Sequence, residues 1–156
     1  MALHIRKFRE SDAKEASEML LGAFQWFHKW NKRSWLWKSL QPSMLIANSK
    51  TQDILVAEKA NNIVGYISST TTPFQVAYIP TVGVASHIQN VGIGTLLLNR
   101  KLRYLRRQKV RKVWLLVTSS NVRAITFYLK YKFVIEGYLR DHTGLGSDEV
   151  LLSKFL

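Results

Sequence analysis

The chain has 156 residues, of which 47% are hydrophobic and 21% charged, a length and composition typical of one globular domain. It contains no cysteine, which excludes disulfides, thiolate metal ligands and a cysteine nucleophile, and no apolar run approaches the length of a membrane span. Lys and Arg number 23 against 10 Asp and Glu, and this net charge of +13 favours a polyanionic partner: nucleic acid, an anionic membrane or a phosphorylated cofactor.

The start of the chain predicts a strand and a long helix. Residues 3–8 alternate apolar and polar side chains, as a half-buried strand does. Apolar residues then recur at helical spacing over about 13–30, and Asp12 and Glu15 have the spacing of a capping box for this helix. No signal peptide precedes these elements, so the expected location is cytoplasmic, with no membrane partner.

A second helix and a hairpin are expected next. The helix covers about residues 33–47, and Pro42 must kink or split it because proline removes a hydrogen bond of the helix. Residues 53–71 read as a strand, a two-residue turn and a second strand. Asn61 and Asn62 form the predicted turn, since asparagine tolerates the positive φ that such hairpins demand.

The middle of the chain predicts a third strand, a helix and a buried strand. The third strand covers residues 75–86, and Pro80 inside it favours an edge position or a bulge. The helix covers about residues 92–108. Residues 112–117 form an apolar run, as expected of a strand buried on both faces.

The last part of the chain completes the predicted fold. Residues 121–131 have helical spacing, and strands are expected over 133–140 and 149–156, on either side of a glycine-rich loop. The element order β-α-α-β-β-β-α-β-α-β-β predicts an α/β (α+β) fold class with a mixed central sheet and helices on its faces. The sequence has no repeat and no linker, so residues 1–156 are predicted to be a single domain.

A glycine-containing turn, Gln89-Asn90-Val91-Gly92-Ile93-Gly94, opens the central helix. The first backbone N–H groups of a helix lack partners within it, and the helix dipole adds positive charge there. Glycine lets the backbone approach a ligand, so the turn suits a pyrophosphate, with the first two side chains as further donors. The alternative is that the two glycines only allow close helix–strand packing. A dinucleotide-binding motif is not favoured, because Leu97 stands where its third glycine would be.

Two motifs of the sequence occur in a characteristic order. Gln89 begins a Gln-x-x-Gly-x-Gly turn after a strand, and about thirty residues later Asn121, Ala124 and Tyr128 have the spacing Asn-x-x-Ala-x-x-x-Tyr, followed by the aromatic Phe133. Together they resemble the GNAT superfamily of acyl-CoA N-acyltransferases. The element order is also that of the family, so the resemblance covers essentially the whole chain. It implies the GNAT fold, with a central sheet that is splayed at the cofactor site.

The resemblance implies a binding site for acetyl-CoA as the cosubstrate, and no metal. Backbone amides of residues 91–95 would bind the pyrophosphate, the strand at 82–84 would pair with the pantetheine arm, and Asn121 would lie near that arm. Arg123 would suit the 3′-phosphate. Tyr128 would act as general acid toward the leaving thiolate, although an aromatic residue at helical spacing is usually part of a core. The implied cofactor-binding residues are Val82, Gly83, Val84, Gln89, Asn90, Val91, Gly92, Ile93, Gly94, Thr95, Asn121, Arg123 and Tyr128.

The general base is left open by the sequence. Many family members carry a glutamate on the splayed strand, and this chain has no carboxylate there. Glu58, Tyr78 and His87 are the candidates, although Glu58 and His87 also suit ordinary surface positions. A lysine amine is neutral in about one molecule in 2,500 at pH 7, and an α-amine in roughly one in ten. A weak or absent base therefore fits an acceptor that is already partly neutral.

A second departure from the family concerns the end of the helix at 121–131. Lys132 stands where the family often has glycine before the aromatic residue. A left-handed helix cap at a non-glycine residue costs on the order of 1 kcal/mol. We therefore expect a different helix end.

Three clusters bear on partners. Residues 100–112 hold eight basic residues and no acidic one, which suits nucleic acid, but a solvated helix face is the favoured interpretation. Four of the five tryptophans and an acidic loop lie in the segments that line the acceptor groove in the family. Aromatic residues more often serve packing, however, and acidic residues in a loop are more often simply solvated. These residues are Trp26, Trp30, Trp35 and Trp37, and Asp141, Asp148 and Glu149.

The sequence therefore predicts an acetyl-CoA-dependent N-acetyltransferase in which the acceptor amine attacks directly within a ternary complex. The best acceptor is a protein amine, an N-terminus or a lysine. The alternatives are a small-molecule amine of the polyamine type, or a non-catalytic module that binds CoA or nucleic acid. The chain is expected to be a monomer or homodimer. Its acceptor, base and acyl chain preference are not fixed by the sequence.

Overall fold

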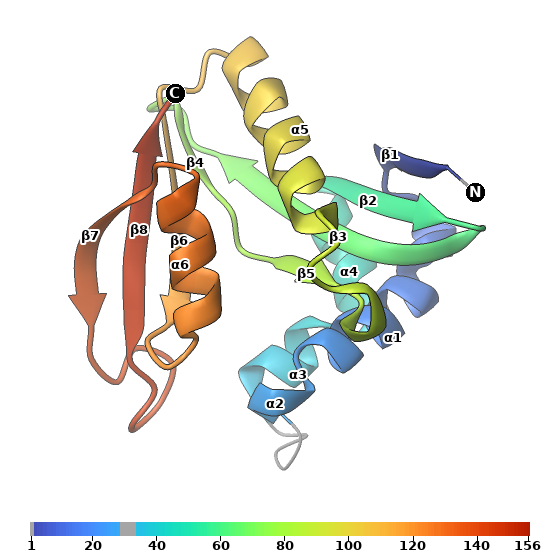
Figure 1. Cartoon of the computed structure of the whole chain (residues 1–156), viewed down its shortest axis with the longest axis horizontal. Coiled ribbons are helices and arrows are strands. Elements are labelled where there is room, and N and C mark those ends of the chain that lie inside the picture. Colours follow the sequence, from blue (N-terminus) through green and yellow to red (C-terminus); the bar gives the residue numbers. More distant parts are fainter. Residues whose placement is uncertain (1, 29–33) are drawn as a thin grey trace. The chain divides into compact units, whose positions relative to one another are not determined.

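The computed structural model describes residues 2–28 and 34–156 (Figure 1). The chain consists of two compact units. The first unit contains Met1–Thr70 and Thr81–Tyr104, and the second contains Thr71–Pro80 and Leu105–Leu156. The strands are β1 (Leu3–Lys7), β2 (Asp53–Lys59), β3 (Asn62–Thr71), β4 (Val76–Tyr78), β5 (Val82–Val84), β6 (Lys112–Thr118), β7 (Val134–Leu139) and β8 (Glu149–Phe155). The helices are η1 (Glu10–Asp12), α1 (Ala13–Ala23), α2 (Gln25–His28), α3 (Trp35–Ser39), α4 (Pro42–Ser49), η2 (Ser86–Ile88), α5 (Ile93–Arg107) and α6 (Val122–Lys130), where η denotes a 3-10 helix.

The two helices predicted before the hairpin are each divided. The first, predicted over 13–30, ends at Ala23 because Phe24 leaves the helical region at φ −105°, and α2 follows; residues 29 and 30 lie outside the described residues. The second is split into α3 and α4, as its proline predicted. Pro42 is the first residue of α4, where its missing N–H costs no helical hydrogen bond.

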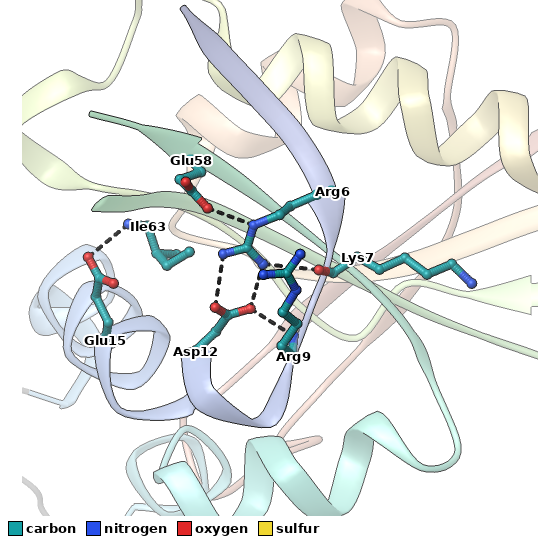
Figure 2. Close-up of polar contacts among 7 residues, drawn as sticks. All are labelled: Arg6, Lys7, Arg9, Asp12, Glu15, Glu58 and Ile63. Atoms are coloured by element: carbon teal, nitrogen blue, oxygen red, sulfur yellow. Dashed lines mark hydrogen bonds and ion pairs between the residues drawn. The ribbon is translucent and has the colours of Figure 1, made fainter. Parts of the chain in front are cut away.

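The capping box predicted at Asp12 and Glu15 is wrong. The Asp12 carboxylate does not cap α1; it accepts hydrogen bonds from the guanidinium of Arg6 at 2.7 and 2.9 Å (Figure 2). Glu15 accepts from the backbone N–H of Ile63 on β3 at 2.8 Å. Asp12 therefore joins the turn before α1 to the preceding strand β1, and Glu15 joins α1 to β3, which is remote in sequence.

The hairpin of β2 and β3 is confirmed, but its turn lies one residue earlier than predicted. Lys59 pairs with Asn62, and the two residues between them, Ala60 and Asn61, have φ values of 51° and 62°. Positive φ at both central positions is the geometry that matches the twist of a hairpin. The register of the strands therefore places alanine, an uncommon residue for this conformation, at the first position.

The predicted third strand is two strands. β4 pairs in parallel with β6 in the second unit, whereas β5 pairs antiparallel with β3 in the first unit. Pro80 lies between them, at a point where the chain leaves one ladder and joins the other, and proline has no N–H to donate to either. The mixed parallel and antiparallel pairing that was predicted is confirmed. The predicted splay concerns both units together and stays a prediction.

The first unit packs helices against both faces of the strands β1, β2, β3 and β5. On one face, α1, α3 and α4 cover a core made of Ala16, Leu20, Leu40, Leu45, Ile54, Val56, Ile63 and Tyr66. On the other face, Ile93 and Leu97 of α5 contact β3 at Gly65. β2 is accordingly buried at four consecutive positions, as expected for a strand covered on both sides.

The second unit orders its strands β4-β6-β8-β7, with only the β4–β6 pair parallel. The prediction that β6 is buried on both faces is wrong in part. Val113, Leu115 and Val117 are buried, and the residues between them, including Trp114 and Leu116, are half-buried. One face of β6 therefore packs into the core and the other keeps partial access to solvent.

Candidate active site

The glycine turn leads directly into α5 in the first unit. Asn90 and Gly92 have φ values of 69° and 85°, and the N–H of Leu96 donates to the Gly92 carbonyl at 3.0 Å as the helix starts. A Cβ added at Gly92 would meet no atom within 4 Å. Glycine is thus favoured here by the backbone conformation, and the alternative that Gly92 serves close packing is wrong.

Close packing of α5 depends on a different glycine, which the sequence did not single out. A Cβ on Gly65 would lie 2.8 Å from Leu97 Cδ1 and 3.0 Å from Ile93 Cγ2. These leucine and isoleucine side chains can approach β3 only because Gly65 has no side chain. The start of α5, and with it the turn, is therefore seated on β3.

Backbone groups of β5 are directed away from β3 at two of the predicted cofactor positions. The N–H of Ser68 donates to the Thr81 carbonyl at 3.0 Å, and the N–H of Ala85 donates to the Val64 carbonyl at 2.9 Å. The odd-numbered residues of this segment therefore make the hydrogen bonds to β3. In an antiparallel pair, bonding alternates along each strand, and the N–H and C=O of Val82 and Val84 point to the other edge. Side-chain Nε2 of Gln89 donates to the Val84 carbonyl at 3.2 Å on that edge, so Gln89 ties the turn to β5.

Gly83, between those two residues, makes room for α1. A Cβ on Gly83 would lie 2.5 Å from Leu20 Cδ2 and 3.4 Å from Phe24 Cε2. The residue was predicted to line the cofactor site through its backbone, and its lack of a side chain also has this packing role in the first unit. Thr95, a further predicted residue, lies in the first turn of α5.

Helix α6, in the second unit, begins directly after Asn121, the first residue of the second motif. Asn121 is its N-cap: the side-chain oxygen accepts from the N–H of Ala124 at 3.2 Å, which explains the Asn-x-x-Ala spacing as a capping interaction. Arg123 is exposed in the first turn, as a phosphate-binding role would need.

The candidate general acid, Tyr128, is buried in the second unit. Its side chain packs edge-to-face on Phe127 and Phe133, with ring centroids 5.1 and 5.4 Å apart. Burial raises the pKa of the Tyr128 hydroxyl, which therefore keeps its proton at neutral pH. Tyr128 is thus part of the core, as an aromatic residue at helical spacing usually is, and it also has the protonated hydroxyl that a general acid requires.

The end of α6 contradicts the expectation drawn from Lys132. This residue does adopt the left-handed conformation, at φ 65°. Its N–H donates to the Leu129 carbonyl at 3.0 Å, and the N–H of Phe133 donates to the Tyr128 carbonyl at 3.1 Å. These two bonds, with the contact between the rings of Phe133 and Tyr128, make a Schellman cap. The helix therefore ends in the left-handed conformation that is typical of glycine, although the residue at this position is lysine.

The three candidate bases have different surroundings. Glu58, on β2, accepts from Nε of Arg6 at 2.6 Å and is engaged in an ion pair (Figure 2). Tyr78, on β4, stacks on Trp114 with centroids 4.2 Å apart, and burial together with the charge of Glu149 raises its pKa. His87 lies exposed in η2, just before the glycine turn. A raised pKa keeps the Tyr78 hydroxyl protonated at neutral pH, so the phenolate form that a general base requires is scarce.

The basic segment 100–112 is divided by the structure into paired and exposed residues. Lys101 is buried and donates to the carboxylate of Asp53 at 2.5 Å, and Lys112 donates to that of Glu136 at 2.6 Å. Sequence reasoning did not find the Lys101–Asp53 pair, because no local signal joins residues on α5 and β2. The remaining basic residues are exposed, namely Arg100, Arg103, Arg106, Arg107, Lys109 and Arg111.

Of the four tryptophans between residues 26 and 37, Trp30 lies outside the described residues. Trp26 and Trp35 are about half exposed, and both contact Phe27 edge-on, with centroids 5.7 and 6.2 Å apart. In the described part of the chain, no helix is both long and apolar enough to cross a membrane. Within residues 2–28 and 34–156, no group of three acidic or histidine side chains is arranged to hold a metal ion.

Comparisons with known proteins assign this arrangement to a family. The model of the acetyltransferase (GNAT) family matches residues 6–133. The chain therefore belongs to the GNAT family of acetyltransferases. Membership confirms the predicted family and the predicted enzyme class, an N-acetyltransferase that uses acetyl-CoA as cosubstrate. A sequence comparison with curated proteins gave no match.

Solved structures of the same fold resemble the chain over its whole length. The PaiA N-acetyltransferase of Thermoplasma acidophilum, in complex with coenzyme A, has 20% identity and a TM-score of 0.83, covering 100% of both chains. The ribosomal-protein-alanine N-acetyltransferase of Brucella melitensis has 24% identity and a TM-score of 0.78, covering 98% of this chain and 99% of the other. A GNAT family acetyltransferase of Elizabethkingia anophelis with acetyl-CoA bound has 18% identity and a TM-score of 0.76, covering 99% and 98%. The predicted fold class is confirmed.

Proposed function

We propose that this acetyltransferase modifies a primary amine of a protein, an N-terminus or a lysine, by direct attack within a ternary complex. The observation that carries the use of acetyl-CoA is the turn before α5, where Gly92 has a φ of 85° and open space in place of a side chain. A helix of 15 residues starts there, and its first N–H groups suit the pyrophosphate of acetyl-CoA. Similarity to a ribosomal-protein-alanine N-acetyltransferase supports a protein acceptor.

The proposed cosubstrate contacts follow the chain from β5 to α6. Backbone amides of residues 91–95 bind the pyrophosphate, and Val82 and Val84 offer backbone groups to the pantetheine arm. Asn121 and Arg123 contribute from α6. The bound acetyl-CoA supplies an activated thioester.

The proposed reaction needs two proton movements. The acceptor nitrogen attacks the thioester carbonyl carbon, a C–N bond forms and the C–S bond breaks. Tyr128 gives its proton to the departing thiolate, and the proton lost by the amine returns to Tyr128 through a base or water. The base is His87, or Tyr78 acting as a proton relay through water, since Glu58 is held by Arg6. An α-amine, roughly one in ten of which is neutral at pH 7, needs little help from either.

The acceptor class is tested by measuring thiol release from acetyl-CoA with four kinds of acceptor: peptides with free N-termini, lysine peptides with blocked N-termini, polyamines and aminoglycosides. The chain has no cysteine to contribute background thiol. We expect release with one of the two peptide classes. Release with polyamines alone would replace the proposal by the small-molecule alternative, and failure to bind acetyl-CoA in calorimetry would overturn it.

Removal of the Tyr128 hydroxyl tests the general acid. We expect Tyr128→Phe to lower kcat about 100-fold, with little change in the KM for acetyl-CoA, because proton transfer to the leaving group is lost while the ring keeps its packing. Tyr131→Phe is the matched control, because it removes a hydroxyl three residues further on and should leave kcat unchanged. Equal kcat values for the two variants would contradict the role of Tyr128.

Three broader expectations belong to the same proposal. The two units act as a single N-acetyltransferase domain, the enzyme works in the cytoplasm, and it is a monomer or homodimer. Binding of nucleic acid by residues 100–112 stays a prediction. A gel shift that Arg106→Glu with Arg107→Glu abolishes would support it.

A further inference from the structure

The loop between β7 and β8 contains two acidic residues that fold the loop itself. Asp148 accepts from the Tyr138 hydroxyl at 2.6 Å and from the N–H of Asp141 at 2.9 Å. Asp141 accepts from the N–H of Gly146 at 2.6 Å. Both carboxylates are thus partnered within the loop. Their role is to shape the loop, and neither has to attract an acceptor.

Glu149, the third acid of this region, is in a different position. It is the first residue of β8, its side chain is only 9% exposed, and Oε2 is buried with no hydrogen-bond partner among the described residues. Nε2 of His142 lies 3.8 Å from Oε2, which is beyond hydrogen-bond distance. A buried carboxylate oxygen without a partner costs free energy, so folding alone does not account for its presence.

The register of the strands places Glu149 on the half-buried face of the second unit's sheet. Glu149 lies opposite Thr118, and Ser153 lies opposite Trp114, so these residues share one face of β6 and β8. Tyr78 joins the same face because it pairs with Trp114 and stacks on it. A buried carboxylate and an aromatic pair thus lie on one face, four residues apart along β8, and the charge of Glu149 adds to the effect of burial in raising the pKa of Tyr78.

We propose that Glu149 binds the acceptor amine as an ammonium ion, on the face of the sheet that also carries Tyr78 and Trp114, and so selects cationic alkyl amines over arylamines, which are neutral. The chemistry is that of ammonium recognition, in which a carboxylate supplies both the charge and the hydrogen-bond acceptor. Burial raises the pKa of Glu149 and the nearby His142 opposes this shift. An arriving ammonium ion supplies the hydrogen-bond donor that Oε2 lacks, and it must give one proton to the base or to water before its nitrogen attacks the thioester. The inference rests on the proposed function.

The first test is independent of turnover. Protein with ¹³C-labelled glutamate side chains is titrated with n-butylammonium chloride at pH 7, and n-butanol serves as the uncharged control. The Glu149 carboxyl resonance is assigned by its absence from the spectrum of Glu149→Gln. We expect butylammonium, and not butanol, to shift this resonance. A Glu149 resonance unmoved by butylammonium overturns the inference, whether or not the chain transfers acetyl groups.

The second test uses whichever acceptor the thiol-release panel identifies. Glu149→Gln should raise the KM for a cationic alkyl amine about tenfold or more and leave the KM for acetyl-CoA unchanged, because a charge-assisted hydrogen bond is lost. An arylamine acceptor should show no such rise. Glu136→Gln, which removes an exposed acid of β7 that pairs with Lys112, is the matched control and should behave as the parent. An unchanged KM in Glu149→Gln overturns the inference and leaves the acetyltransferase proposal standing.

Circular dichroism establishes that each variant is folded. If Glu149→Gln does not fold, Glu149→Asp takes its place, since it keeps the charge but withdraws it by one methylene. The expected rise in KM is then smaller and again confined to cationic acceptors. If neither acetyl-CoA binding nor transfer is found in the parent chain, the proposed function fails, while the butylammonium titration still decides the role of Glu149.

Discussion

At the scale of single residues, the backbone conformation of a few positions decides what their side chains can do. Gly92 is glycine because its φ is positive, and Gly65 is glycine because α5 needs the space of a side chain. Lys132 also has a positive φ, although it is not glycine. Its cap nonetheless fixes Tyr128 and Phe133 relative to each other. The chain therefore tolerates local strain in order to hold the candidate general acid in place.

That strain predicts a stabilising substitution. Lys132→Gly should raise the free energy of unfolding by about 1 kcal/mol, because glycine adopts the left-handed conformation without the clash of a Cβ. Lys130→Gly, two residues earlier in the last turn of α6, should lower it by up to about 1 kcal/mol, since glycine is a poor helix former. Urea unfolding of both variants measures the difference. A Lys132→Gly variant less stable than the parent would contradict the assigned cap.

At the scale of elements, one guanidinium joins three segments of the first unit. Arg6 of β1 donates to Glu58 of β2 and, through two nitrogens, to Asp12 of η1, and the N–H of Arg9 donates to Asp12 at 2.7 Å (Figure 2). Burial by itself raises the pKa of Asp12, but the bonds from Arg6 and Arg9 outweigh it, so the pKa is lowered overall. The ionised form of Asp12 is therefore the form that holds β1 to the turn before α1.

Asp12→Asn should lower the free energy of unfolding by about 2–3 kcal/mol at pH 7, because hydrogen bonds to a charged group are lost. A lowered folded-state pKa contributes stability that is complete above the unfolded-state pKa, near 3.9, and is lost as the pH falls through the folded-state value. The parent and the variant should consequently converge in stability below about pH 3.9.

Denaturant titrations at pH 7 and at acid pH measure this difference. Glu10→Gln, which changes an exposed acid of the same turn, is the control and should stay within about 0.5 kcal/mol of the parent. A gap between parent and Asp12→Asn that is constant with pH would show that the carboxylate charge is not the cause.

At the scale of the whole molecule, the chain consists of two compact units and carries a net charge of +13. The motifs that resemble the family are divided between the units, with the glycine turn in the first and Asn121 to Tyr128 in the second. A single acetyltransferase domain requires both. Net charge of this size attracts the phosphates of acetyl-CoA as well as other polyanions, and such attraction weakens as salt is added.

If the chain is one domain, its units should unfold together. Four of the five tryptophans lie between residues 26 and 37, in the sequence of the first unit, and Trp114 lies in the second. In Trp114→Phe, fluorescence therefore reports the first unit, and it should follow the same denaturation curve as far-UV circular dichroism of the whole chain. Separate transitions would show that the units unfold independently.

Acetyl-CoA at 100 times its Kd should raise the free energy of unfolding by about 2.7 kcal/mol, because it binds the folded chain and not the unfolded one.

The sequence by itself determined the fold class, the family and the outline of the element order, because these depend on apolar periodicity and on motifs that are local in the chain. It also located the turn before α5 and the Asn121 to Tyr128 helix. It did not show that the third strand would be two strands or that the first helix would be divided. It placed the hairpin turn one residue late, because positive φ was read from residue type, whereas the pairing of Lys59 with Asn62 fixes which residues turn.

Only the tertiary structure decided which polar groups are consumed and which stay available. Arg6 takes Glu58 out of the set of free bases, Asp53 neutralises Lys101, and the loop before β8 uses both of its acids. Glu149 keeps a buried oxygen without a hydrogen bond for a reason that no local pattern contains. Hydrogen bonds and burial join residues that are tens of positions apart in the chain, so residue type predicts what a side chain can do and packing decides whether it remains free to do it.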